Sequence, residues 1–160
     1  MKTTTVIHPF PPVYNEDSAI LILGTFPSVK SRENAFYYGH KQNRFWKVLS
    51  SVMKDDCPRE TEEKIRFLLK HRIALWDVIQ TCEISGSSDS SIKNAVANDL
   101  EALLKETSIS KIFCNGKKAY ELYQKFFPDL SVPVKCLPST SPANAIWSIE
   151  RLIEEWSKIE

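Results

Sequence analysis

Four short apolar segments, three of which are followed by a residue that favours a turn, constrain the fold of this chain more than any other feature. They are residues 19–23 before Gly24, 73–78, 111–114 before Asn115 and Gly116, and 132–137 before Pro138. Apolar runs of this length are typical of strands covered on both faces, as at the centre of a parallel sheet.

Segments with the apolar period of a helix follow these runs and are long enough to connect parallel strands. Their predicted apolar faces are Phe45, Val48, Leu49 and Val52; Ile65, Leu68 and Leu69; Ile92, Val96, Leu100 and Leu103; Tyr120, Tyr123 and Phe127; and Ile146, Ile149, Leu152, Ile153 and Trp156. Strands that alternate with helices predict an α/β fold with three α/β/α layers around a central, mainly parallel four-stranded sheet.

The length of 160 residues predicts a single domain over residues 1–160. With 42% hydrophobic and 26% charged residues, the composition is that of a soluble globular protein. The chain has no apolar run long enough for a membrane span or a signal peptide, so we expect a cytoplasmic protein. We also expect a monomer.

Charge and cysteine content restrict the class of ligand. The net charge of +1 gives no bulk attraction to nucleic acid, so a nucleic-acid partner would need a local patch. The four cysteines contain no Cys-x-x-Cys pair, which argues against a zinc or iron–sulfur site. We therefore expect no metal and no cofactor, and we interpret the cysteines as buried, reduced thiols.

Ligands of open parallel sheets bind outside the carboxyl ends of the strands, which directs attention to the loops there. The loop of residues 24–28 is by itself explained as a turn built from glycine and proline. Lys117 and Lys118 follow Asn115 and Gly116 at a predicted helix start, where the helix dipole disfavours cations. A bound phosphate would compensate, although a solvated lysine that tolerates the penalty is an equal alternative.

The loop after the last strand presents short hydroxyl side chains at the same edge. Ser141 is the expected N-cap of the last helix, with Pro142 as its first residue. Ser139 and Thr140 precede it, and residues 85–91 hold further serines. Such neutral donors suit sugar–phosphate contacts, but serine-rich segments also occur as ordinary loops.

Residues 36–46 hold five aromatic side chains together with a histidine, an asparagine and an arginine. Aromatic residues beside polar groups suit stacking on a base that has left the duplex. As an alternative, Phe45 and Trp46 are core residues of the following helix and Asn43 is its N-cap. A core role is harder to justify for the aromatic residues at positions 36–38.

The motifs of the chain resemble, in order, those of the hypoxanthine (deoxyinosine) DNA glycosylases of the uracil-DNA glycosylase superfamily. They are Gly24-Thr-Phe-Pro-Ser28, Phe36-Tyr-Tyr-Gly-His-Lys-Gln-Asn-Arg-Phe-Trp46, Trp76-Asp-Val-Ile79, Cys82, Gly86-Ser-Ser-Asp-Ser-Ser-Ile92 and Pro138-Ser-Thr-Ser-Pro-Ala143. The resemblance covers about residues 12–157. The motifs Asn43-Arg-Phe-Trp46, Asn115-Gly-Lys117 and Pro138-Ser-Thr-Ser141 are also similar to those of mismatch-specific uracil and thymine glycosylases.

The resemblance implies a DNA-binding enzyme that excises a deaminated base, most simply hypoxanthine, without a lysine nucleophile. It assigns Asn43 to catalysis, by orienting water or bonding the base edge, and Tyr38 to stacking on the base. The implied base pocket comprises Gly24, Thr25, Phe26, Pro27, Ser28, Tyr38 and His40. The implied DNA contacts are Ser87, Ser88, Asn115, Gly116, Lys117, Ser139, Thr140 and Ser141.

Two differences from the motifs of uracil glycosylases argue against an enzyme specialised for uracil. Phe26 stands where mismatch-specific uracil enzymes carry a water-positioning asparagine, and Leu137 stands where many uracil enzymes carry histidine or asparagine. The alternatives are a uracil or xanthine glycosylase on the same scaffold, a DNA-binding domain without activity, and a nucleotide-binding α/β domain. The chain lacks the Gly-x-Gly-x-x-Gly pattern that would favour the last of these.

Overall fold

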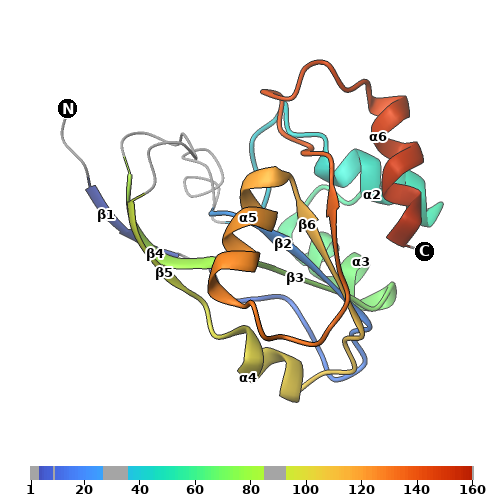
Figure 1. Cartoon of the computed structure of the whole chain (residues 1–160). Helices are drawn as coiled ribbons and strands as arrows, with labels where there is room; N and C mark the ends of the chain where they lie inside the picture. Colours follow the sequence, from blue (N-terminus) through green and yellow to red (C-terminus); the bar gives the residue numbers. More distant parts are fainter. Residues whose placement is uncertain (1–3, 9, 27–35, 85–92, 160) are drawn as a thin grey trace.

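The computed structural model describes residues 4–8, 10–26, 36–84 and 93–159 (Figure 1). Its centre is a four-stranded sheet with the order β3-β2-β6-β7 and parallel pairing throughout. The strands are β2 (Ile20–Gly24), β3 (Ile73–Asp77), β6 (Lys111–Asn115) and β7 (Val134–Leu137). All four predicted strands and the predicted parallel sheet are therefore confirmed.

Helices cover both faces of this sheet, as the apolar runs predict. One core cluster joins Ile22 to residues of α2 (Phe45–Met53), α3 (Thr61–Lys70) and α6 (Ile149–Trp156), which continues as the short 3-10 helix η2 (Ser157–Ile159). The other joins Leu21 and Leu23 to α4 (Leu100–Lys105) and α5 (Lys117–Phe126). Successive residues of β2 thus point into different cores, which confirms the three-layer arrangement.

A second, antiparallel sheet with the order β1-β4-β5 was not predicted from the sequence. It contains β1 (Thr4–Ile7), β4 (Ile79–Ile84) and β5 (Lys93–Ala97) and extends to one side of the central sheet (Figure 1). The helix expected over residues 92–103 is therefore wrong in its first half. Val96 lies in β5 and is exposed, because pairing with β4 prevails over the local period. Helix α4 begins after Asp99, whose carboxylate accepts a hydrogen bond from Ala102 N at 3.1 Å.

The predicted start of the last helix is also wrong. Helix α6 begins at Ile149, and the Ser148 hydroxyl caps it by accepting a hydrogen bond from Arg151 N at 3.2 Å. Residues 141–147 form turns instead, because the carbonyl oxygens of Ser141 and Asn144 accept hydrogen bonds from turn amides. Ile146, which the apolar period placed on the buried helix face, is 82% exposed in this loop.

The interpretation of all four cysteines as buried thiols is half correct. All four are free, and Cys82 and Cys114 are buried, but Cys57 and Cys136 are exposed. Cys136 lies in β7, which is an edge strand of the central sheet and is covered less completely than β2 and β6. Within the described residues, no helix is both long enough and apolar enough to cross a membrane.

Candidate functional site

Residues that the sequence analysis singled out lie at the carboxyl ends of the four parallel strands. Gly24 ends β2 and pairs in register with Asp77, which ends β3. Asn115 ends β6 and pairs with Leu137, which ends β7. In a parallel sheet these four ends share one edge, where ligands of such folds bind.

Close contacts at Gly24 define one half of this edge. A β-carbon at Gly24 would lie 2.4 Å from Asp77 Oδ1 and 2.9 Å from the hydroxyl of Tyr38. Only glycine leaves room for both oxygens, which is the physical reason for glycine at the end of this strand. The next residue, Thr25, is buried, and its carbonyl accepts a hydrogen bond from Ile79 N at 3.2 Å.

Tyr38 has one ring face covered by Phe45. The ring centroids are 4.0 Å apart and the planes are tilted by only 16°. Tyr38 has a left-handed backbone with φ of 54°, which is uncommon for residues other than glycine and is found disproportionately at functional sites. Its half-buried ring is therefore held as a fixed surface beside Gly24.

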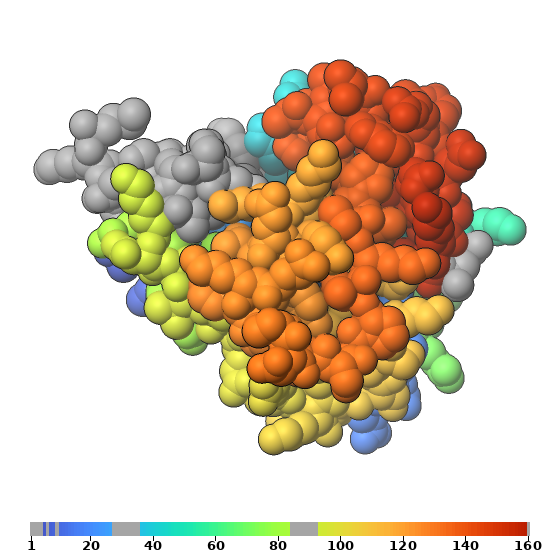
Figure 2. All heavy atoms as spheres, viewed as in Figure 1, coloured from blue at the N-terminus to red at the C-terminus, as the bar shows by residue number. Residues whose placement is uncertain are grey.

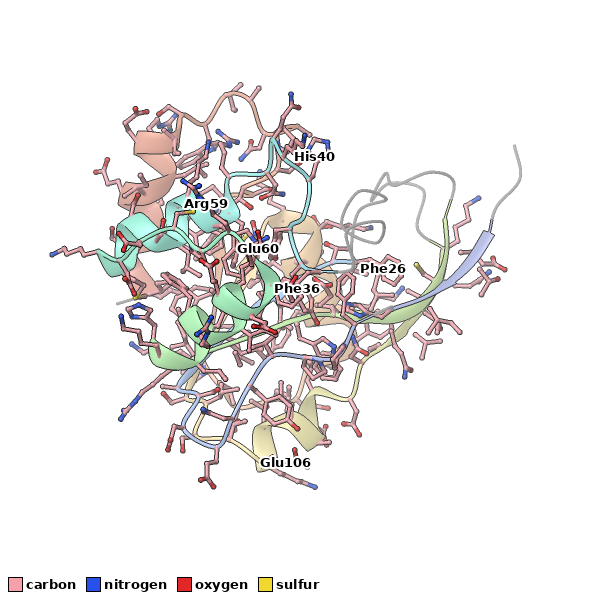
Figure 3. The ribbon with its side chains drawn as sticks, turned by 180° about the vertical axis from the view of Figure 1, so that it is seen from behind. Phe26, Phe36, His40, Arg59, Glu60 and Glu106 are labelled. Atoms are coloured by element: carbon pink, nitrogen blue, oxygen red, sulfur yellow. The ribbon has the colours of Figure 1, made fainter. Side chains whose placement is uncertain are left out.

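The other aromatic residues before α2 belong to the core, contrary to the sequence analysis. Phe36 and Tyr37 are 6% and 2% exposed, and the Tyr37 hydroxyl donates to Pro11 O at 2.9 Å. Phe36 belongs to the core cluster of Ile22, Phe26 packs against the cluster of Leu21 and Leu23, and His40 lies in the loop before α2 (Figure 3). His40 Nδ1 accepts a hydrogen bond from Gln42 N at 3.0 Å, so this ring supports a turn.

The side-chain oxygen of Asn43 is fully occupied by two donors. Asn43 Oδ1 accepts from Phe45 N at 3.0 Å and from the Thr140 hydroxyl at 2.8 Å. The backbone donor at Phe45 fixes which end of the amide is oxygen. Arg44, not Asn43, is the N-cap of α2, but Asn43 still satisfies the first helical amide. No described residue accepts a hydrogen bond from Asn43 Nδ2, so the amide retains its donor end.

Thr140 connects Asn43 to the end of β6. Thr140 N donates to Asn115 Oδ1 at 3.0 Å, and Asn115 Nδ2 donates to Thr140 Oγ1 at 3.1 Å. The carbonyl of Thr140 accepts from Arg44 N at 3.1 Å. Thr140 is 0% exposed, so its polar groups are used inside the protein and its side chain presents no surface to DNA.

Arg44 fixes the loop after β7 and was not identified from the sequence. Its guanidinium donates to the carbonyl oxygens of Trp147, of Ser141 at 3.0 Å and of Asn144 at 3.2 Å. The side chain therefore holds residues 141–147 against the start of α2. Only the position of Arg44 next to Asn43 could have suggested this role.

Ser139 and Ser141 stabilise their own loop through hydroxyl oxygens that accept from Ser141 N at 3.1 Å and from Ala143 N at 3.2 Å. Ser139 also lies against Gly116, where a β-carbon would come within 3.2 Å of Ser139 Cβ. Gly116 has φ of 99° and precedes Lys117, the exposed first residue of α5. Figure 2 shows α5 and the loop after β7 on the same face.

A second buried polar pair lies at the end of β3. His8 Nε2 and Asp77 Oδ2 are 2.7 Å apart, and their side chains are 3% and 5% exposed. Neither residue was identified as a site residue from the sequence. An acidic residue at the end of an apolar strand could have drawn attention to Asp77, but nothing near His8 in the sequence indicated its partner.

Four predicted site residues, Pro27, Ser28, Ser87 and Ser88, lie outside the described residues. The described part of the chain contains no group of three or more histidine, cysteine or acidic side chains arranged to hold a metal ion.

Comparison with known proteins identifies the family. The model of the uracil DNA glycosylase superfamily matches residues 11–158. The chain belongs to this superfamily. A hypoxanthine DNA glycosylase of Methanosarcina acetivorans is 36% identical over 152 residues, which cover 94% of this chain and 95% of that protein. A hypoxanthine DNA glycosylase of Methanosarcina barkeri is 34% identical over 138 residues, which cover 84% of this chain and 86% of that protein.

A solved member of the superfamily has the same fold. The solution structure of a putative uracil DNA glycosylase from Methanosarcina acetivorans superimposes with a TM-score of 0.83 at 34% identity, over 96% of each chain. The predicted family and fold class are thereby confirmed.

Proposed function

We propose that this chain is a monofunctional DNA glycosylase that removes hypoxanthine from DNA by hydrolysis. The observation that carries the proposal is the convergence of Gly24, Asp77, Tyr38 and the Asn43–Thr140–Asn115 network at the carboxyl edge of the sheet. The curated relatives of similar length named above support hypoxanthine as the base.

In the proposed reaction, the base leaves the helix and stacks on the ring of Tyr38, which Phe45 supports from one side. The bond between C1′ and the base nitrogen breaks, and its electron pair goes to the base. Water adds to the oxocarbenium-like sugar and releases a proton. Asn43 Nδ2 donates a hydrogen bond to the departing base and stabilises its developing negative charge.

The occupied oxygen of Asn43 supports one of the two roles expected from the sequence. A group that orients water for attack accepts a proton of that water, whereas Asn43 Oδ1 already accepts two hydrogen bonds. The role as a donor to the base edge is therefore favoured. Lys117 and the serines at positions 139 and 141 contact backbone phosphates, and Thr140 supports them from inside.

The test is a set of otherwise identical duplexes that contain hypoxanthine, uracil, xanthine or a thymine mismatch, with alkali cleavage to reveal abasic sites. Hypoxanthine is expected to be excised fastest, and borohydride is expected to trap no covalent protein–DNA adduct. Faster excision of uracil or xanthine would select that base instead. Binding without excision of any of them would refute the proposal.

The enzyme is proposed to act in the cytoplasm as a monomer without metal. Sedimentation at micromolar concentration and activity in excess chelator test the last two points. A dimeric mass, or loss of activity with chelator, would contradict the corresponding point.

A further inference from the structure

We propose that Asp77 recognises a deaminated base by accepting a hydrogen bond from the ring N–H group that deamination creates. We further propose that His8 positions the Asp77 carboxylate for this contact. This inference rests on the proposed function, because it requires that a base be brought to the carboxyl edge of the sheet. It assigns a specificity-determining residue and a positioning residue to that edge.

Asp77 lies where a base held by Tyr38 would meet it. Its Oδ1 and the Tyr38 hydroxyl both approach the Cα of Gly24, as the space for a β-carbon shows. None of the described residues donates a hydrogen bond to Oδ1, while Oδ2 is engaged by His8. The carboxylate therefore retains one acceptor oxygen at the edge of the sheet where ligands bind.

His8 fixes the direction of this carboxylate. Phe10 N donates to His8 Nδ1 at 3.4 Å, which leaves the ring proton on Nε2 to be donated to Asp77 Oδ2. The imidazole packs against the rings of Phe10, Phe26 and Tyr37, at centroid distances of 5.3, 5.8 and 5.7 Å. The ring can therefore neither rotate freely nor exchange Asp77 for water.

A largely buried carboxylate that lacks a donor for one oxygen costs free energy unless solvent or a ligand supplies that donor. Carboxylates are rarely buried without enough donors, and exceptions concentrate at functional sites. Asp77 is 3% exposed, and its charge contributes, after burial itself, to raising the pKa of the neighbouring Tyr37. Among the described residues, His8 alone donates a hydrogen bond to this carboxylate.

Deamination changes the group on the base that such an acceptor would meet. Adenine and cytosine present a ring nitrogen lone pair on the Watson–Crick edge, whereas hypoxanthine and uracil present a ring N–H at the same position. A carboxylate oxygen accepts a hydrogen bond from the N–H and repels the lone pair. Asp77 would therefore distinguish a deaminated base from its parent.

The experiment measures binding without chemistry, in duplexes whose target nucleotide carries a 2′-fluorine that suppresses bond cleavage. One duplex contains hypoxanthine and the other adenine, each opposite thymine. The cost of opening either duplex is the same for every protein variant. A change in the ratio of the two dissociation constants therefore reports the contact with the base.

Asp77→Asn tests the acceptor directly. His8 would continue to donate to the amide oxygen, which would turn the amide nitrogen, a donor, toward the base. The preference for hypoxanthine over adenine is expected to fall by about 10- to 100-fold relative to the wild-type protein. An unchanged ratio in a variant with a wild-type unfolding temperature would overturn the inference.

His8→Phe keeps an aromatic ring among its neighbours and removes the donor, whereas His8→Gln retains a side-chain N–H. The first variant is expected to lose most of the preference and the second to retain it within about threefold. Because His8 does not contact the base, a merely structural role would weaken binding to both duplexes equally. Equal weakening, with the ratio unchanged, would also overturn the inference.

The chain offers a matched control at the other end of β3. His71 Nε2 and Asp55 Oδ2 are 2.8 Å apart, and His71 lies just before the amino end of the strand that Asp77 completes. His71→Phe is expected to leave the ratio unchanged, and a shift as large as that of His8→Phe would overturn the inference. Failure of the wild-type protein to excise any base refutes the proposed function instead, so the two failures are distinguishable.

Discussion

The hydroxyl of Thr140 donates a hydrogen bond to Asn43 Oδ1 at 2.8 Å, across 97 residues of sequence. This bond connects the loop after β7 to the segment before α2. Together with the Phe45 amide it occupies both lone pairs of the Asn43 oxygen. Oδ1 of Asn43 therefore has a structural role, whereas Nδ2 is the atom proposed to act in catalysis. Substitutions can test the two roles separately.

Asn43→Asp and Asn43→Ala separate these ends. Aspartate keeps an acceptor for Phe45 N and Thr140 but loses the N–H donor, whereas alanine loses both. Single-turnover excision is expected to fall at least about 100-fold in both variants. Unfolding free energy is expected to fall by about 1 kcal/mol only in Asn43→Ala, because that variant alone leaves the first helical amide unsatisfied. Wild-type excision by Asn43→Asp would refute the donor role.

Thr140→Val removes a hydroxyl that acts as both donor and acceptor inside the protein. The substitution leaves Asn43 Oδ1 and Asn115 Nδ2 each without one partner, so we expect a loss of about 1–3 kcal/mol in denaturant unfolding. Thr140→Ser retains the hydroxyl and serves as the control. Affinity for undamaged duplex is expected to remain unchanged in both variants. Weaker duplex binding with unchanged stability would restore Thr140 as a direct DNA contact.

Gly24→Ala places a methyl group against Asp77 Oδ1 and the Tyr38 hydroxyl, at 2.4 and 2.9 Å before relaxation. Such overpacking costs about 1–3 kcal/mol and displaces both site residues, so thermal stability and excision rate should fall together. Adding Tyr38→Phe removes one of the two close oxygens and is expected to recover part of the lost stability. If Tyr38→Phe recovers none of the lost stability, the clash with Asp77 alone accounts for the destabilisation by Gly24→Ala.

Lys117→Gln tests the phosphate contact proposed at the start of α5. If the ammonium neutralises one phosphate, the slope of log K against log salt should become shallower by about 1. Lys125→Gln, in the last turn of the same helix, is the control of equal charge and should leave the slope unchanged. Equal changes in both variants would indicate a general effect of net charge and would count against a contact at Lys117.

Thiol reactivity follows from the position of each cysteine. In the native protein at pH 8, a disulfide reagent is expected to modify Cys57 and Cys136, which are exposed, and all four thiols only after unfolding. Cys114 is protected doubly, because burial, more than the neighbouring Cys136, raises its pKa to about 12 and leaves little thiolate to react. Cys57→Ser should therefore leave one reactive thiol. Rapid modification of Cys114 in the folded protein would contradict this environment.

The errors in predicting the elements have a common physical cause. Val96 fits a helical period, but pairing of β5 with β4 makes it an exposed strand residue. Ser141 has the chemistry of a helix cap, but Arg44 binds its carbonyl oxygen and Ser148 caps α6 instead. In each case a contact with a residue distant in sequence outweighs a local preference worth about 1 kcal/mol or less.

The four parallel strands, the edge at which Gly24, Asn115 and the loop after β7 meet, and the family could all be predicted from the sequence. Apolar period and motif order are local properties of the chain. The folded structure was needed to show which atoms of Asn43 remain available, and that His8 contacts the Asp77 carboxylate 69 residues away. Hydrogen-bond partners of this kind are selected when strands and loops pack together, and no spacing along the chain encodes them.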